Sequence, residues 1–451
     1  MKIRLSEFAR IVGGECLGDG ELTDFCIDSR KAKAGDMFVC LKGARVDGHD
    51  YIPKAAQNGA TSALVERKMP TDLPCVLVPD TLKALQDFAA WYRNQLDLKV
   101  IAVTGSVGKT TTKEFIAAVL SRAFPTYKTQ GNMNSETGLP LTLIHTEPEH
   151  RAVVTEMGMC GFGEISELSL IARPDIGVLT NIGVCHIEYL GSREGILKAK
   201  CEIVDGMSDD GVLILNGDDP LLATVSDTKQ RRVRYGLNSP EYEYYAYNVA
   251  VLSEGVCFTA KTPLGDLDVN LAIDGIHNVY NSLAAIAVGV ECGMDLKSIG
   301  EGLLCMEKAP MRQNVRKEKG MTLIEDCYNA SPTSMKASID VLKGKSGRKI
   351  AVLGDMLELG ENSAEYHRSV GEMLEGVSVL IAYGDYASAY LEGASKAGVL
   401  QRIPCRTAED AAVNLNLVAR EGDVILFKAS RGMHAETVIE SFLNDTNREE
   451  V

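Results

Sequence analysis

The sequence predicts an α/β protein of three domains, on the strength of three observations. Its 451 residues exceed what one hydrophobic core of ordinary size holds. Short apolar segments alternate with helical patterns over 99–235 and again after residue 311, which is typical of parallel sheets covered by helices. A glycine loop at 105–111 joins one predicted strand to a helix. We expect a small N-terminal domain (1–80), a central domain with a mostly parallel sheet (81–311) and a C-terminal doubly wound, Rossmann-like domain (312–451).

The composition narrows the possible functions. Hydrophobic residues make up 45% of the chain and charged residues 24%, which is the balance of a soluble globular protein. The formal net charge of −15 argues against nucleic acid or an anionic membrane surface as a partner. The 12 cysteines include no Cys-x-x-Cys pair, and no apolar run suits a signal peptide or a membrane span. We therefore expect a cytoplasmic protein with reduced thiols and no membrane insertion.

The first 95 residues predict a small α/β or β-rich unit followed by a helix. Turn signals such as Gly35-Asp36 and Asp47-Gly48 separate short segments, of which 38–41 and 63–65 are the clearest strands. Apolar residues then recur at helical spacing over 81–95. This predicted helix leads into the strand that precedes the glycine loop.

The remaining elements follow from the same patterns. In the central section we expect strands at 99–104, 152–157, 176–181 and 211–216, antiparallel hairpins over 241–273 and a helix at 278–290. In the last section we expect strands at 322–326, 348–353, 377–383 and 423–428, with helices at 333–342, 364–374 and 408–420. The acidic end, Glu449-Glu450, is expected to be a frayed tail.

The glycine loop has the order of strand, loop and helix that a phosphate-binding loop needs. It reads Gly105-Ser106-Val107-Gly108-Lys109-Thr110-Thr111. Backbone N–H groups and the helix N-terminus can hold phosphates, Lys109 can reach the outer ones, and Thr110 can bind Mg²⁺. The general pattern asks for a glycine where Val103 stands. The alternative is a glycine turn that merely joins a strand to a helix, but the predicted strand before the loop and the helix after it favour ATP binding.

Polar residues at the ends of other predicted strands are candidates for the same site. Glu156 ends one strand and is a candidate Mg²⁺ ligand, although a carboxylate there can equally be a solvated cap. His186 follows the next strand, and Asp326 follows the first strand of the last section. Parallel strands place their carboxyl ends at one edge of a sheet, where ligands bind.

Four further residues are ambiguous when taken singly. Lys200 lies on a predicted helix and is most simply an exposed lysine. Asn278 and Asn281 lie one helical turn apart and could read a base edge or cap the helix. Arg312, between the second and third sections, could reach a phosphate across an interdomain cleft.

As a set, these residues resemble the Mur ligases, a family of ATP-dependent amide-forming enzymes of peptidoglycan synthesis. The resemblance covers essentially the whole chain, and the family's own loop lacks the glycine that is missing at Val103. In order, the matching features are the glycine loop, Glu156, Asn181-x-Gly-x-x-His186, Gly191-Ser192, Ala199-Lys200, His277-Asn278-x-x-Asn281, Arg312 and Asp326.

Further motifs resemble the branch of the family that adds D-alanyl-D-alanine to a UDP-muramoyl-tripeptide. They are Thr129-Gln-Gly-Asn-Met-Asn134 with Gly138-Leu-Pro140, Asp326-x-Tyr328-Asn329-Ala330-x-Pro332, the run 353–360 and Lys428-Ala-Ser-Arg-Gly-Met433. Ser331 and Ala429 depart from the branch's usual Asn and Gly. The Asp-Asn-Pro-Arg run of the diaminopimelate-adding relative is absent from the sequence. Asp28-Ser29-Arg30 resembles a motif of the UDP-binding domain that both branches share.

The resemblance implies ATP, Mg²⁺ and two small-molecule substrates, with an acyl phosphate formed on the tripeptide's terminal carboxylate. It implies that residues 105–111 bind the phosphates of ATP and that Lys109 stabilises the transferred charge. It also implies one Mg²⁺ ion held by Thr110 and Glu156 and a second held by His186. Lys200 would be carbamylated. The resemblance also places Asn278, Asn281, Arg312 and Asp326 near the nucleotide, and Ser29, Arg30, Asn134, Tyr328 and Asn329 near the substrates. Peptidoglycan synthesis links such an enzyme to cell wall biogenesis, cell shape and cell division, and we expect it to act as a monomer.

Alternatives within and outside the enzymes stay open at this point. One alternative is another amide ligase of the superfamily, such as folylpolyglutamate synthase or the diaminopimelate-adding relative. The full UDP-type N-terminal domain argues against folylpolyglutamate synthase. A non-catalytic ATP-binding scaffold is another, against which Lys109, Glu156, His186 and Lys200 argue. Whether the tripeptide's third residue is diaminopimelate or lysine is left undecided.

Overall fold

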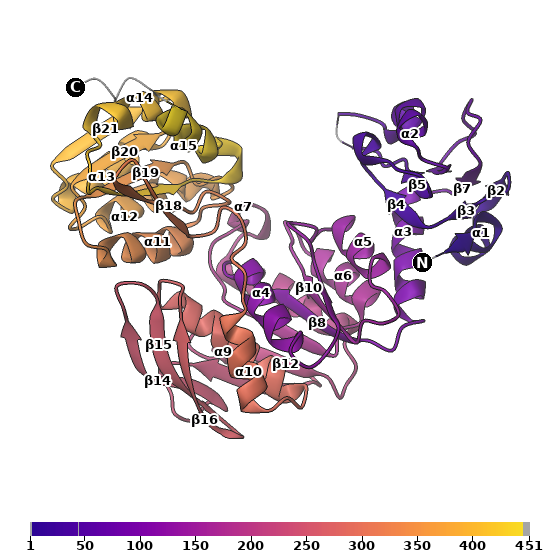
Figure 1. Ribbon diagram of the computed structural model, residues 1–451, viewed down its shortest axis with the longest axis horizontal. Coiled ribbons are helices and arrows are strands. Elements are labelled where there is room, and N and C mark those ends of the chain that lie inside the picture. Colours follow the sequence, from indigo (N-terminus) through magenta and orange to yellow (C-terminus); the bar gives the residue numbers. More distant parts are fainter. Residues whose placement is uncertain (1, 44, 445–451) are drawn as a thin grey trace.

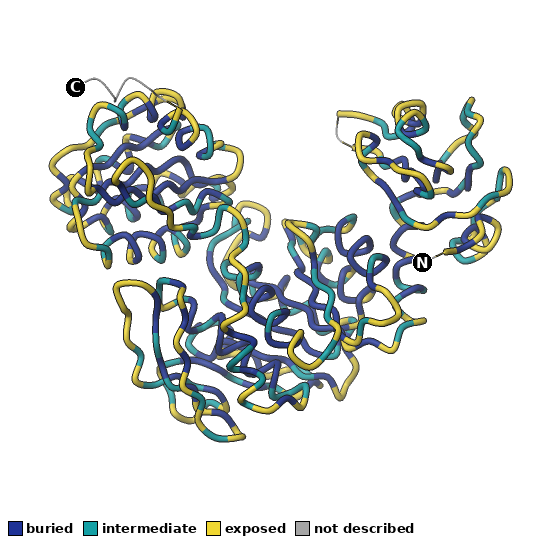
Figure 2. Tube along the Cα trace, viewed as in Figure 1, coloured by how far each residue is buried: buried dark blue, intermediate teal, exposed yellow. Residues whose placement is uncertain are grey.

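The computed structural model describes residues 2–43 and 45–444, and it folds into three α/β domains (Figure 1). The predicted fold class is therefore confirmed. Each domain is built on its own sheet, and the buried residues follow these sheets and the helices that cover them (Figure 2). The expected acidic tail at Glu449 and Glu450 lies outside the described residues.

The N-terminal domain is a small mixed sheet with helices. Strands β4 to β7 are parallel, and β2 pairs with β7 in the antiparallel sense at one edge. The elements are β1 (Ile3–Arg4), α1 (Leu5–Val12), β2 (Glu15–Leu17), β3 (Glu21–Leu22), β4 (Asp24–Cys26), β5 (Asp36–Val39), α2 (Ile52–Asn58), β6 (Ser62–Val65) and β7 (Cys75–Leu77).

Helix α3 (Thr81–Arg93) connects the first two domains and packs against both. Its Phe88 ring lies 5.0 Å from that of Phe8 in the N-terminal domain. One turn later, the Tyr92 hydroxyl donates a hydrogen bond of 3.0 Å to the carbonyl of Thr146 in the central domain. The expected boundary after residue 80 thus falls at the start of a helix whose apolar face both domains share.

The central domain is a nine-stranded sheet, parallel from β9 to β14 and antiparallel from β14 to β16. Side chains alternate between the two faces of β8: Val100 and Ala102 join one core cluster, Ile101 and Val103 the other. The strands are β8 (Lys99–Thr104), β9 (Thr126–Lys128), β10 (Ala152–Glu156), β11 (Ile176–Leu179), β12 (Val212–Asn216), β13 (Arg231–Gly236), β14 (Tyr244–Val251), β15 (Val256–Thr262) and β16 (Gly265–Leu271).

Helices cover both faces of this sheet. One face carries α4 (Lys109–Leu120), α9 (His277–Glu291) and α10 (Leu296–Leu304), and the other α5 (Gly138–Ile144), α6 (Glu164–Ala172) and α8 (Arg193–Cys201). The short helix α7 (Ile187–Leu190) lies on the side of the domain that meets the C-terminal domain (Figure 1). Val103 occupies the position at which the general phosphate-loop pattern has a glycine. It is fully buried in the core between the sheet and helices α4, α9 and α10.

The C-terminal domain is a doubly wound sheet in the order β17-β18-β22-β19-β20-β21, parallel except for the edge strand β17. Its strands are β17 (Asn314–Glu318), β18 (Met321–Glu325), β19 (Lys349–Gly354), β20 (Val379–Tyr383), β21 (Gln401–Cys405) and β22 (Val424–Lys428). Its helices are α11 (Pro332–Gly344), α12 (Ser363–Glu372), α13 (Ala387–Lys396), α14 (Ala408–Val418) and α15 (Ala435–Asn444). The first three cover one face and the last two the other.

Two further features of the described residues bear on function. Every cysteine is a free thiol. None of the described helices combines the length and the apolar character that a bilayer crossing requires.

Candidate active site

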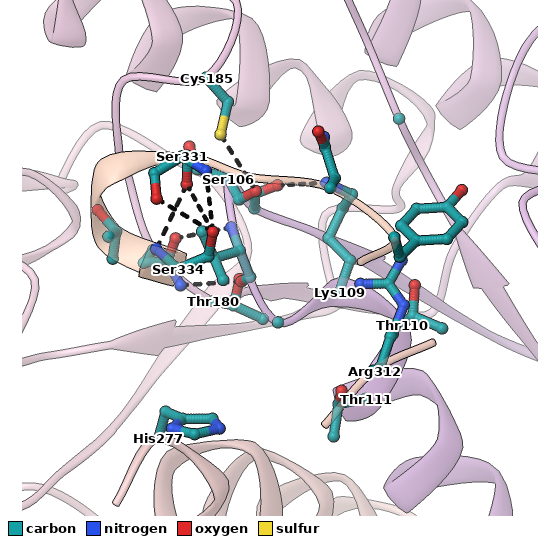
Figure 3. Close-up of a pocket in the computed structure, with 18 of the residues that line it drawn as sticks. Ser106, Lys109, Thr110, Thr111, Thr180, Cys185, His277, Arg312, Ser331 and Ser334 are labelled. Carbon is teal, nitrogen blue, oxygen red and sulfur yellow. Dashed lines mark hydrogen bonds between the residues drawn. The ribbon is translucent and has the colours of Figure 1, made fainter. Parts of the chain in front are cut away.

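A cavity of about 540 Å³ lies where the carboxyl edge of the central sheet faces the C-terminal domain. Figure 3 shows side chains of both domains around it, with Lys109, Thr110 and Thr111 contributed by the central domain and Ser331 and Ser334 by the C-terminal one. Most of the predicted site residues line it: 105–111, Asn134, Glu156, His186, Lys200, Asn278, Asn281, Arg312, Asp326, Tyr328 and Asn329. Their clustering makes this cavity the candidate active site.

The glycine loop is held in shape by the end of the neighbouring strand β11. The backbone N–H of Val107 donates to Asn181 Oδ1 at 2.9 Å, and its carbonyl accepts from Thr180 Oγ1 at 2.6 Å and Asn181 Nδ2 at 2.9 Å. A Cβ at Gly105 would lie 1.9 Å from Thr180 Oγ1, so this position requires glycine. Contacts within the protein therefore hold the loop in this shape.

Asn278 and Asn281 make hydrogen bonds within the protein from the first turns of α9. Asn281 Oδ1 accepts from Thr112 Oγ1 at 3.1 Å, and Asn281 Nδ2 donates to Asn278 Oδ1 at 3.0 Å. Asn278 Nδ2 in turn donates 2.7 Å to the carbonyl of Asp274. Both amides line the cavity, but they also hold α4 and the segment just before α9, so their contact with a nucleotide stays a prediction.

Glu156 is buried, which removes the alternative of a solvated cap. Its Oε2 accepts from Thr110 Oγ1 at 2.8 Å, and its Oε1 accepts from Asn134 Nδ2 at 2.8 Å. A hydroxyl and a carboxylate at this separation suit Mg²⁺, which takes few protein oxygens and completes its shell with phosphate and water. The described residues hold no cluster of three or more His, Cys, Asp or Glu able to bind a metal ion.

Lys200 corrects the simplest expectation from sequence, because it is buried rather than exposed. Its relative exposure is 2%, and its side-chain nitrogen makes no hydrogen bond or ion pair with any described residue. Burial, with a smaller contribution from the nearby Lys109 charge, lowers the pKa of Lys200 to about 7. Lys200 lies four residues after the buried Ile196, on the apolar face of α8, and this spacing was the signal in the sequence.

His186 lies at the interdomain side of the cavity in a left-handed backbone conformation, with φ of 61°. Its Nδ1 atom is buried and lies 2.6 Å from Oε2 of Glu358 in the C-terminal domain, an ion-pair contact without hydrogen-bond geometry. Burial lowers the pKa of His186, although the Glu358 carboxylate acts in the opposite direction. The other ring nitrogen, Nε2, makes no hydrogen bond with any described residue, and a neutral imidazole with such a nitrogen is a suitable metal ligand.

The C-terminal wall of the cavity is organised by a buried ion pair. Lys428 Nζ lies 2.6 Å from Asp326 Oδ2 and donates to the carbonyl of Asn329 at 3.1 Å. Burial alone would raise the pKa of Asp326, but Lys428 and the Ser338 hydroxyl outweigh it and lower the pKa. Lys428 lines the cavity and was not among the predicted site residues, although its motif had been singled out.

Arg312 and Tyr328 form a second cationic feature of this wall. The guanidinium carbon lies 4.0 Å from the centre of the Tyr328 ring, which is the geometry of a cation–π contact. Stacking restrains the orientation of the guanidinium at the mouth of the interdomain cavity.

Ser29 and Arg30 do not line this cavity. They lie in the N-terminal domain, where the Arg30 backbone N–H donates to Asp28 Oδ1 at 3.1 Å and its guanidinium Nε donates to the same oxygen at 2.8 Å. Their predicted role in binding the UDP part of a substrate is not tested by the cavity.

Asn181 and Glu358 are not among the residues predicted for the site. Both lie in motifs that carry the resemblance, Asn181-x-Gly-x-x-His186 and the run 353–360.

Comparisons with known proteins agree with this architecture along the chain. A family model described as "Mur ligase middle domain" matches residues 103–289, and one described as "Mur ligase, glutamate ligase domain" matches 311–431. A third, described as "Mur ligase family, catalytic domain", matches residues 22–93. Together they cover all three structural domains.

Individual proteins are similar over nearly their full length. The UDP-N-acetylmuramoyl-tripeptide–D-alanyl-D-alanine ligase of Bacillus subtilis is 39% identical over 425 residues, covering 92% of each chain. The crystal structure of MurF from Acinetobacter baumannii is 33% identical with a TM-score of 0.91, covering 98% of this chain and 99% of that one. The MurF ligase of Thermotoga maritima in complex with ADP is 32% identical with a TM-score of 0.82, covering 93% and 96%.

Proposed function

This chain belongs to the Mur ligase family, and from that premise we propose that it joins D-alanyl-D-alanine to UDP-N-acetylmuramoyl-tripeptide in an ATP-dependent reaction. The product is the UDP-muramoyl-pentapeptide precursor of peptidoglycan. The observation that carries the proposal is the single cavity in which the glycine loop, Glu156 and Lys200 face the Asp326–Lys428 wall. Full-length similarity to a D-alanyl-D-alanine ligase supports the choice of substrates.

The chemistry explains why an ATP site and a second domain are needed together. A carboxylate is a poor electrophile, so its oxygen first attacks the γ-phosphorus of ATP, giving an acyl phosphate and ADP. The amine of the dipeptide then attacks the acyl carbon, and the C–O bond to phosphate breaks with loss of one amine proton. The glycine loop and Lys109, which line the cavity, would stabilise the negative charge on the transferred phosphoryl group.

We also propose Mg²⁺ for this site. Thr110 and Glu156 would hold one ion, with Asn134 fixing the second oxygen of the carboxylate, and His186 would contribute to another. When bound, Mg²⁺ neutralises phosphate charge and orients the phosphoryl group for transfer. His186 lines the same cavity, and its Nε2 atom makes no hydrogen bond with any described residue.

Lys200 is proposed to carry a carbamate. Its amine adds to CO₂ with loss of one proton, and the product is an anion where the free lysine would be a cation. Because the pKa of Lys200 falls to about 7, much of the amine is neutral near pH 7 and can react. A carbamate would also remove the repulsion between Lys200 and Lys109, and it would suit neighbouring metal ions.

The other assignments complete the proposal. Asn278, Asn281, Arg312 and Asp326 would contact the nucleotide, and Tyr328 and Asn329 the dipeptide, as the C-terminal domain closes. Ser29 and Arg30 would bind the UDP part of the other substrate. The enzyme would act in the cytoplasm as a monomer, and its product would serve cell wall biogenesis, cell shape and cell division.

The test supplies candidate substrate pairs and measures both phosphate release and product mass. We expect phosphate only with ATP, a UDP-muramoyl-tripeptide and D-alanyl-D-alanine together, and a product mass equal to the pentapeptide. Tripeptides ending in diaminopimelate and in lysine are compared in parallel, and Lys109→Ala is the inactive control. Faster addition of a single diaminopimelate or lysine to a UDP-muramoyl-dipeptide would overturn the proposed substrates.

A further inference from the structure

A residue of the C-terminal domain outside the predicted site set contacts His186, which lines the cavity. Glu358 lies in the loop between β19 and the 3₁₀ helix Gly360–Asn362. Its Oε2 is 2.6 Å from Nδ1 of His186, so the contact joins the two domains at the cavity wall. Nothing in the reaction described above assigns Glu358 a role.

The loop that carries Glu358 is anchored at successive residues. Asp355 Oδ2 accepts from the backbone N–H of Asp385 at 2.7 Å. The next two N–H groups donate to buried side chains: that of Met356 to His367 Nε2 at 2.9 Å, and that of Leu357 to Ser430 Oγ at 2.9 Å. The C-terminal domain therefore fixes the position of the Glu358 backbone.

Both residues of the contact adopt an unusual backbone conformation. His186 and Glu358 each have φ of 61°, in the left-handed region that residues other than glycine seldom occupy. Such strain persists where the surrounding structure imposes it, and it concentrates at functional sites. The domains also approach closely beside the contact, since a Cβ at Gly360 would lie 3.7 Å from Cα of Glu188 in α7.

The position of the Glu358 carboxylate, beside Nδ1 of His186, indicates its role. A carboxylate beside one ring nitrogen of a metal-binding histidine fixes the tautomer and the ring orientation, leaving the other nitrogen for the ion. His186 Nε2 makes no hydrogen bond with any described residue.

We infer that Glu358 is a positioning residue that orients His186 for metal binding, so that the C-terminal domain completes the metal site of the central domain. The inference rests on the proposed function only for the use of His186 as a ligand. Its consequence is that divalent-ion affinity depends on a residue more than 170 positions away in sequence, in a different domain.

The experiment titrates Mn²⁺ into the full-length protein with ADP present and measures free Mn²⁺ by electron paramagnetic resonance. We expect Glu358→Ala to weaken a Mn²⁺ site about tenfold or more. Glu358→Gln keeps an oxygen at the position that faces Nδ1 and should retain most of the affinity. Glu365→Ala is the matched control, since Glu365 is an exposed residue of α12 that pairs with Arg368 in the same helix.

Two outcomes would overturn the inference. The first is unchanged Mn²⁺ affinity in Glu358→Ala, with a normal thermal melt. The second is that the losses in His186→Ala and Glu358→Ala add in the double variant, because residues acting on one site should not be additive. No peptide substrate enters this titration, so its result is independent of whether the wild-type enzyme makes the pentapeptide.

Discussion

Two buried lysines stand on opposite walls of the cavity, and their surroundings differ completely. Lys428, on the C-terminal wall, is 2% exposed and pairs with the Asp326 carboxylate at 2.6 Å. Lys200, on the central wall, is equally buried at 2% exposure and has no partner among the described residues. Two lysines at the same depth therefore differ in pairing: Lys428 has a carboxylate partner and Lys200 has none among the described residues.

This difference separates a structural role from a chemical one. A buried cation that pairs with a carboxylate, as Lys428 does, organises the loop around it. A buried cation without one is destabilised, and its pKa falls until the neutral amine becomes accessible near pH 7, as for Lys200. The neutral amine is the form that can react. We therefore expect removal of Lys428 to damage the fold and removal of Lys200 to damage the activity.

The strongest test of the comparison is Lys428→Met. This change leaves Asp326 buried without its cation, and we expect it to lower the free energy of unfolding by about 3–5 kcal/mol. Urea unfolding followed by circular dichroism measures the change. The double variant Lys428→Met/Asp326→Asn should recover part of the loss, because it removes the unpaired charge as well. A Lys428→Met protein as stable as the wild type would remove the basis of the comparison.

Lys200→Met should show the opposite pattern. We expect the ligase turnover to fall roughly 100- to 1,000-fold, as when a preorganised charged group is removed from an active site. The free energy of unfolding should be unchanged or higher, because an unmatched buried amine is gone. Short carboxylates such as acetate should partly restore the smaller variant Lys200→Ala, by standing in for a carbamate.

The matched control for this variant is Lys198→Met. Lys198 is exposed two residues earlier on the same helix, with its Nζ 5.7 Å from the centre of the Phe162 ring. Its turnover should stay within a few-fold of the wild type. Full activity of Lys200→Ala without added carboxylate would contradict a chemical role for Lys200.

The pH dependence of stability sharpens the comparison further. The pKa of Lys200 is about 7 in the folded protein and near 10.5 unfolded, so the unfolded chain binds more protons between these values. Stability relative to Lys200→Met should therefore rise with pH across this window, by up to about 1.4 kcal/mol per unit, and stay flat below pH 7. Urea titrations of both proteins at pH 6, 7, 8 and 9, without bicarbonate, measure the difference. A constant difference would show that Lys200 keeps an ordinary pKa.

The smallest expected effect concerns the cation–π contact between Arg312 and the Tyr328 ring. Arg312 lies over Tyr328 at 4.0 Å, and this contact should contribute about 0.5–1 kcal/mol to stability. A double-mutant cycle of Arg312→Gln and Tyr328→Leu, measured by urea unfolding, isolates the coupling. A coupling energy indistinguishable from zero would mean that the ring only covers the guanidinium.

The elements that the sequence predicted well are those whose burial is uniform. The strand expected at 99–104 is β8 (Lys99–Thr104), because a central parallel strand is buried on both faces and reads as a continuous apolar run. The edge strands β17 (Asn314–Glu318) and β21 (Gln401–Cys405) were missed. Each has a sheet partner on only one side and carries exposed polar residues, so neither shows an apolar pattern.

The sequence alone determined which fold class and family to expect, because strand patterns, the glycine loop and motif order are local properties of the chain. Only the tertiary structure decided that the Lys200 side chain has no partner within 2–43 and 45–444, that Lys428 has one, and that Glu358 faces His186. The environment of a charge depends on groups that folding brings together from distant segments. Local pattern identifies the residue types present in a site, but desolvation and pairing, which set their chemistry, arise only in three dimensions.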